Sequence, residues 1–252
     1  MRFRPCIDIH QGVVKQIVGG TLNGASQKVI ENFVAEEDAA YFAEMFKRDK
    51  LTGGHVIMLG PGNENEALKA IHAYPNGLQI GGGITADNAA FFLEQGATHV
   101  IVTSYVFRDG AVNFQNLDQI CAVTGKDKLV LDLSCRSKNG TYFVVADKWQ
   151  KFSNFEISEV GLRELAGYCD EFLVHAADVE GLCKGIEENL VTKLGRWVTI
   201  PTTYAGGART IADLELVNQL SQGKLDLTIG SALDIFGGNL PYRDVVNWAP
   251  KG

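Results

Sequence analysis

Two aspartates stand at matching places in this chain and could carry acid–base chemistry. Asp8 lies near the end of the apolar segment 3–9, and Asp132 lies near the end of the apolar segment 128–133, an offset of 124 (132 − 8). Two carboxylates facing one pocket can serve as general acid and general base when their environments separate their pKa values. A strand-end aspartate can instead accept hydrogen bonds from the backbone of the next loop, but the repeated position favours catalysis.

Two glycine-rich stretches repeat with the same offset. Gly82 and Gly83 lie in the stretch 78–87, and Gly206 and Gly207 lie in the stretch 203–213; Gly83 and Gly207 differ by 124 (207 − 83). The exposed N–H groups of a glycine turn can donate hydrogen bonds to a phosphate, and the N-terminus of the helix that follows adds a partial positive charge. A tight turn explains either stretch alone, whereas two copies favour two phosphate cups.

Polar residues after the next strand in each repeat complete the predicted cups. Thr103 and Ser104 would join the first glycine pair, and Gly230 and Ser231 would join the second. In barrel enzymes the loops after the seventh and eighth strands often bind phosphate in this way. The sequence therefore predicts a small-molecule substrate with a phosphate at each end.

Three further residues are candidates for substrate contacts. Trp149 could stack on a flat heterocycle or pack on a rim. His175 could line the pocket or be a satisfied histidine. Lys15 could bind an anion or be a solvated surface lysine. Asp178 and Glu180 could orient ligand hydroxyls or cap the sixth helix.

The elements that must position these residues alternate regularly. Short apolar strands followed by helical patterns predict a parallel sheet. Eight such units in 252 residues favour one (β/α)8 TIM barrel over 1–252, built from two fused half-barrels, about 1–124 and 125–252. Loops are expected at 19–29 and 136–152, and an extended segment at 13–18. The expected strands are 3–9, 55–59, 78–80, 99–102, 128–133, 171–175, 198–204 and 225–229. The expected helices are 36–48, 64–72, 87–94, 112–123, 157–167, 187–197, 211–220 and 242–248.

Composition narrows the partners and the compartment. The formal net charge is −7 and no basic run occurs, which argues against nucleic acid and anionic membranes as partners. The five cysteines lack CxxC spacing and indicate free thiols of a cytoplasmic protein. No segment reads as a secretory signal or a membrane helix. No metal-ligand spacing or cofactor motif is present, so we expect a reaction without metal or cofactor. We also expect the protein to be a monomer.

Several segments together resemble the phosphoribosylformimino-5-aminoimidazole carboxamide ribotide isomerases of histidine biosynthesis. These segments are 5–15, the GGGI motif, 130–133, 171–182 and 204–208, and the segment 226–240 resembles the eukaryotic branch. The resemblance implies an Amadori rearrangement of an aminoaldose to an aminoketose. It implies that Asp132 is the general acid, that Asp8 is the general base removing the C2 proton, and that Trp149 stacks on substrate.

The sequence departs from the bacterial pattern of this family in three places. Segment 58–60 stands where an aspartate is common, Thr85 where an arginine is common, and Ala176 where a threonine is common. Thr85 leaves the first cup more dependent on backbone N–H groups. The cyclase of the same pathway, which needs ammonia from a partner, and a non-catalytic bisphosphate-binding barrel are the alternatives. The continuation after Lys15 and the Trp149 loop favour the isomerase.

Overall fold

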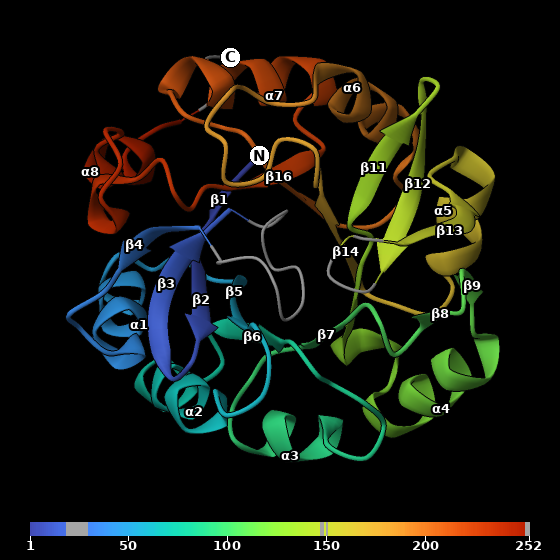
Figure 1. The fold of residues 1–252 in the computed structure, drawn as a ribbon, viewed down its shortest axis with the longest axis horizontal. Helices are drawn as coiled ribbons and strands as arrows, with labels where there is room; N and C mark the ends of the chain where they lie inside the picture. The colour runs from blue at the N-terminus through green and yellow to red at the C-terminus, as the bar shows by residue number, and fades with distance from the viewer. Residues whose placement is uncertain (19–29, 147–148, 150, 250–252) are drawn as a thin grey trace.

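The structure, a computed structural model, describes residues 1–18, 30–146, 149 and 151–249. Figure 1 looks into a ring of strands with helices around its outside. Within the described residues, eight parallel strands form this ring, the first in two pieces. In order around it they are β1 (Phe3–Arg4) with β2 (Cys6–His10), β5 (Gly54–Met58), β6 (Leu78–Gly81), β7 (Val100–Val102), β10 (Leu129–Asp132), β14 (Glu171–His175), β15 (Thr202–Ala205) and β16 (Leu225–Thr228).

Closure of the ring depends on the divided first strand. Pro5 lacks an N–H group and separates β1 from β2, so the expected single strand over 3–9 is interrupted there. β1 pairs in parallel with β16, at Phe3 with Leu227, and β2 pairs in parallel with β5, at Asp8 with Ile57. The predicted TIM barrel is therefore confirmed. The expected strand over 198–204 begins later, at Thr202.

Each barrel strand is followed by a helix on the outer surface. The helices are α1 (Ala39–Arg48), α2 (Glu64–Ala73), α3 (Ala89–Glu94), α4 (Phe114–Thr124), α5 (Glu159–Leu165), α6 (Glu188–Trp197), α7 (Ile211–Ser221) and α8 (Tyr242–Val246). Side chains cap several of their first turns, as Thr210 and Asp213 do reciprocally at α7. Among the described residues, no helix has the length and apolar character needed to cross a membrane.

Antiparallel strands extend the carboxyl ends of two barrel strands. β3 (Val13–Ile17) and β4 (Glu31–Val34) continue from β2, through a turn in which Gln11 and Gly12 both have positive φ, as a type I′ hairpin requires. β11 (Cys135–Lys138), β12 (Thr141–Ala146) and β13 (Lys151–Glu156) form a separate sheet after β10.

The prediction of a long loop over 136–152 is therefore wrong. Asn139 and Gly140, both with positive φ, turn the chain between β11 and β12. A third pair, β8 (Phe107–Arg108) with β9 (Ala111–Val112), follows β7. The predicted loop at 19–29 lies outside the described residues.

The barrel interior is layered. Four buried side chains, Ile101, Val130, Leu173 and Ala205, form an apolar cluster separate from the main core between strands and helices. Because side chains alternate along a strand, residues two positions earlier or later on these strands face the same interior. The apolar layer therefore separates a polar layer near the strand starts from polar residues near the strand ends.

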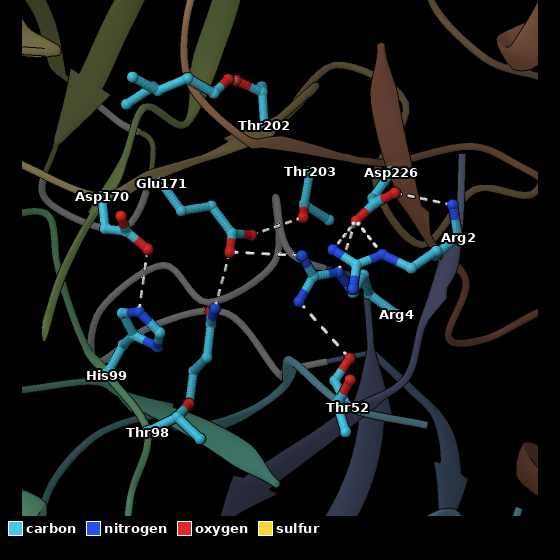
Figure 2. A network of polar contacts seen from close by, with 12 residues as sticks. Arg2, Arg4, Thr52, Thr98, His99, Asp170, Glu171, Thr202, Thr203 and Asp226 are labelled. Carbon is cyan, nitrogen blue, oxygen red and sulfur yellow. Dashed lines mark hydrogen bonds and ion pairs between the residues drawn. The ribbon is translucent and has the colours of Figure 1, made fainter. Parts of the chain in front are cut away.

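The polar layer near the strand starts is a buried ionic network (Figure 2). Arg4 donates from Nε to Asp226 at 2.7 Å and approaches Glu171 at 3.5 Å. Glu171 also accepts hydrogen bonds from Gln79 and Thr203, at 2.9 and 2.7 Å. The network links five barrel strands and satisfies the charges that burial would otherwise penalise.

Candidate active site

The candidate active site lies at the carboxyl ends of the barrel strands, where barrel enzymes carry their chemistry. Asp8 is the third residue of β2, Asp132 ends β10 and His175 ends β14. Asp132 and His175 stand two residues beyond Val130 and Leu173 of the apolar layer, so their side chains face the same interior. The strand periodicity thus brings a histidine and two carboxylates to one end of the barrel.

Asp132 accepts three hydrogen bonds from side chains. Ser134 donates to Oδ1 at 2.8 Å, Thr103 donates to Oδ2 at 3.0 Å, and His175 Nδ1 lies 3.2 Å from Oδ1. Burial acts to raise the pKa of Asp132, but the charge of His175 and these hydrogen bonds outweigh it and hold that pKa below its ordinary value. Asp132 is therefore ionised at neutral pH.

Asp8 has a contrasting environment. Burial raises the pKa of Asp8 to about 7, and the neighbouring Glu180 carboxylate adds to the rise. His175 and a hydrogen bond from Gln16 Nε2 to Asp8 Oδ2, at 3.2 Å, act in the opposite direction. A carboxyl that titrates near neutral pH is suited to accept and return a proton. The two aspartates thus have the separated pKa values that paired acid–base work requires.

His175 lies beside two other rings. Burial acts to lower the pKa of His175, but the charge of Asp132, its hydrogen bond and the carboxylates Glu180 and Asp8 raise that pKa to about 9. The His55 ring lies 6.0 Å away edge-on, and the Trp149 ring lies 6.1 Å away, tilted by 39°. Burial, together with the charge of His175, lowers the pKa of His55 to about 3. His175 is therefore the charged member of the histidine pair.

Two cavities meet at these residues. The larger, of 260 Å³, is lined by Asp8, Asp132 and Trp149 among others, and the smaller, of 40 Å³, by Cys6 and His55 among others. Asp8, His175 and Glu180 line both cavities. These three side chains therefore lie between the two cavities.

The predicted phosphate cups fall on opposite sides of that junction. Three members of the first cup line the larger cavity, and all members of the second line the smaller. They are Gly82, Thr103 and Ser104 in the larger cavity, and Gly206, Gly207, Gly230 and Ser231 in the smaller. Gly83 does not line the larger cavity, although its positive φ shapes the turn beside Gly82.

Lys15 lies outside both cavities. Its side chain is buried and forms an ion pair with Glu31 of β4 at 2.6 Å, so the solvated-lysine interpretation is wrong and the anion contact has no support from the structure. Neighbouring residues of a strand point to opposite faces. Gln16, the next residue of β3, therefore reaches the site that Lys15 does not.

Like His55, which lines the smaller cavity, Gln16 is a site residue that reasoning from the sequence missed. Its Nε2 donates to Asp8, and its Oε1 accepts a hydrogen bond from Ser231 Oγ at 3.1 Å. A Cβ on Gly230 would clash with Gln16 Oε1, so a side chain there would displace the Gln16 amide from its present position. The strand alternation of 13–18 was the signal that could have selected Gln16 over Lys15.

Asp178 and Glu180 have separate roles, and neither caps the sixth helix, whose N-cap residue is Glu187. Asp178 accepts hydrogen bonds from Arg136 Nε and Ser137 N, at 2.7 and 2.8 Å, and so fastens β11 to the segment after β14. Glu180 instead lines both cavities, and burial raises its pKa. Among the described residues, no group of three or more His, Cys, Asp or Glu side chains is arranged to hold a metal ion.

The chain is similar in sequence to proteins of known name over nearly its whole length. Residues 2–240 match the family model described as histidine biosynthesis protein. A protein of Neurospora crassa is 53% identical over 251 residues, covering 98% of each chain, and is named 1-(5-phosphoribosyl)-5-((5-phosphoribosylamino)methylideneamino)imidazole-4-carboxamide isomerase. A Medicago truncatula protein of the same name, described as chloroplastic, is 52% identical and covers 98% of this chain and 81% of its own. The Saccharomyces cerevisiae isomerase is 46% identical, covering 99% and 98%.

Proposed function

Because the chain belongs to the histidine biosynthesis protein family, we propose that it is an isomerase of that pathway. It converts N′-(5′-phosphoribosylformimino)-5-aminoimidazole-4-carboxamide ribonucleotide, an aminoaldose, to its phosphoribulosyl aminoketose. The reaction is an Amadori rearrangement, and the isomerase names of relatives about 50% identical support it over ring closure by the cyclase. No metal or cofactor enters the proposed reaction.

The observation that carries the proposal is the position of Asp8 and His175 at the junction of two cavities. The substrate has a phosphate at each end, and each cavity holds one of the predicted cups. In the proposed binding mode, one phosphate meets the backbone around Gly82 with Thr103 and Ser104. The other meets the glycines of the smaller cavity and Ser231. The ribose to be opened then lies between them.

The chemistry needs an acid on the ribose ring oxygen and a base at C2. Asp8 titrates near neutral pH and is the proposed base. The general acid acts from the side of the barrel opposite Asp8, where Asp132 and its hydrogen-bonded neighbours lie. Trp149, which lines the larger cavity beside His175, is proposed to stack on the imidazole carboxamide.

The test is an absorbance assay on the aminoaldose, run with and without ammonia. Rearrangement without ammonia is the expected result. Ring closure that requires ammonia would identify a cyclase instead. An unchanged spectrum, with binding detected by calorimetry, would identify a binding protein and overturn the proposed activity.

We also propose that the enzyme is a cytoplasmic monomer. Three of its five cysteines, Cys6, Cys135 and Cys169, are buried free thiols, which suits a reducing compartment. The Medicago relative is named chloroplastic, so imaging of a fluorescent fusion in the source cell is the decisive measurement. Sedimentation equilibrium tests the monomer.

A further inference from the structure

We propose that His175, not Asp132, is the group that donates the proton to the ribose ring oxygen, and that Asp132 is the residue that positions it. This inference rests on the proposed isomerase activity and assigns the acid of that reaction to a different side chain. It follows from three geometric observations: how Asp132 is bonded, where His175 lies, and which atom of His175 is left available.

The hydrogen bonds of Asp132 suit it to orient His175 rather than to donate a proton itself. Both carboxylate oxygens accept hydrogen bonds, from Ser134 and His175 at Oδ1 and from Thr103 at Oδ2. Two of these donors are hydroxyl groups fixed close to Asp132, one directly after β7 and one two residues after β10. A carboxylate supplied with several donors is stabilised in its charged form and has no proton to give. Its lowered pKa agrees with this bonding.

His175 lies closer to the centre of the site than Asp132 does. Asp132 lines only the larger cavity, whereas His175 lines both, together with Asp8. A substrate that spans the two cups must pass the junction with its central ribose. The ring oxygen of that ribose therefore comes within reach of His175, and C2 comes within reach of Asp8.

The imidazole is held in one orientation, with one nitrogen free. Nδ1 is bonded to Asp132, and among the described residues Nε2 has no hydrogen-bond partner. Contacts with the rings of His55 and Trp149 restrict rotation of the imidazole. A histidine fixed by a carboxylate at one nitrogen presents its other N–H to a substrate, as a general acid must. The pKa of about 9 keeps His175 charged at neutral pH.

The proton transfers balance without any other reactant. The Nε2 proton of His175 goes to the ring oxygen as the C1–O bond breaks, and the nitrogen lone pair forms C1=N. Asp8 removes the C2 proton, and those electrons form C1=C2 while the C=N pair returns to nitrogen. Neutral His175 then takes the proton of the C2 hydroxyl as C2=O forms, and Asp8 returns its proton to C1. Both side chains end in their starting states.

The experiment compares pH profiles of kcat/KM for wild type, His175→Gln and Asp132→Asn. In wild type we expect the rate to fall on the basic side near pH 9, as His175 loses its proton. His175→Gln should lower the rate at least ~10²-fold and abolish the basic fall. Asp132→Asn should move the fall to lower pH, because the carboxylate that stabilises the imidazolium is gone. The matched control is His72→Gln, a change of an exposed histidine on α2 that should keep the wild-type profile.

Two further measurements separate a loss of catalysis from a loss of the folded structure in a variant. Circular dichroism and thermal unfolding show whether each variant keeps the fold. Nuclear magnetic resonance of ¹⁵N-histidine in wild type reads the protonation of His175 directly, with His175→Gln assigning the signal. A charged ring at pH 7.5 supports the proposal, and a neutral ring overturns it. A basic fall that persists in folded His175→Gln also overturns it while leaving the isomerase intact. Absence of rearrangement in wild type would instead overturn the proposed function itself.

Discussion

Gln16 lies against the Asp8 carboxyl group, donating from Nε2 to Oδ2 at 3.2 Å. The other end of the same amide accepts a hydrogen bond from Ser231 Oγ, a member of the second predicted phosphate cup. A single buried side chain thus connects a phosphate cup to the proposed catalytic base. We therefore expect phosphate binding at this cup and the basicity of Asp8 to be linked through this amide.

Replacing Gln16 by Met should raise the pKa of Asp8 above about 7, since the lost hydrogen bond favours the charged carboxylate. A base works only when deprotonated, so the acidic side of the kcat/KM profile should move to higher pH. The loss of activity should then be larger at pH 6 than at pH 8. Gln119→Met, on the exposed side of α4, is the matched control. A uniform loss at all pH values would show that Gln16 only holds the fold.

Asp8→Asn removes the proposed base and leaves a side chain of nearly equal shape. Turnover should fall at least ~10²-fold, the usual size of an acid–base contribution, while calorimetry still detects substrate binding. Asp118→Asn, an exposed change on α4, controls for the loss of one negative charge. Turnover near the wild-type value in Asp8→Asn would remove Asp8 from the mechanism.

Metal removal should leave the reaction unchanged, because every proposed step moves a proton between substrate and a side chain. The measurement is turnover after exhaustive treatment with a strong chelator. Loss of activity that added zinc or magnesium restores would contradict the proposed mechanism. A control sample without chelator, at the same ionic strength, separates metal removal from the effect of salt on phosphate binding.

Gly82 and Gly83 offer a matched pair of alanine substitutions at the first cup. A Cβ at Gly82 would clash with the carbonyl of Met58, whereas a Cβ at Gly83 meets nothing within 4 Å. Both residues have positive φ, so each alanine costs about 1 kcal/mol in backbone strain. Gly82→Ala must also shift the backbone and should raise KM far more than Gly83→Ala does. Equal effects on KM would argue against close backbone contact with the phosphate at Gly82.

The barrel could be predicted from the sequence because strand and helix patterns alternate along the whole chain. The three-stranded sheet after β10 could not be recognised from short-range apolar patterning, since its strands mix exposed and buried residues. Asn139-Gly140 was nevertheless an available signal, because this dipeptide is typical of two-residue hairpins. The division into halves at 1–124 and 125–252 stays a prediction.

The electrostatics of the site were harder to predict than its position. The spacing of Asp8 and Asp132 pointed to paired acid and base, but the sequence does not show which groups surround each carboxyl. Asp132 is saturated by donors from three strands or strand ends, and Asp8 is buried beside Glu180. Apart from Ser134, these neighbours come from distant parts of the chain, and only the closed barrel brings them together. The role of His175 depends entirely on that closure.

The buried network around Arg4 should contribute strongly to stability without touching the reaction. Arg4 and Glu171 side chains are both 6% exposed, so removing the guanidinium leaves carboxylates with little access to water. Arg4→Met should lower the free energy of unfolding by about 3–5 kcal/mol, the typical cost of breaking a buried ion pair. Urea denaturation measures this change.

The matched control is Arg163→Met, which breaks an i,i+4 pair with Glu159 on α5 whose side chains are 66% and 53% exposed. That change should cost no more than about 1 kcal/mol, because water and salt screen an exposed pair. The apolar layer of Ile101, Val130 and Leu173 lies between the Arg4 network and the candidate active site. The folded Arg4→Met variant should therefore have the kcat and KM of the wild type. Equal destabilisation by the two arginine variants would mean that water reaches the Arg4 network and that burial does not govern its strength.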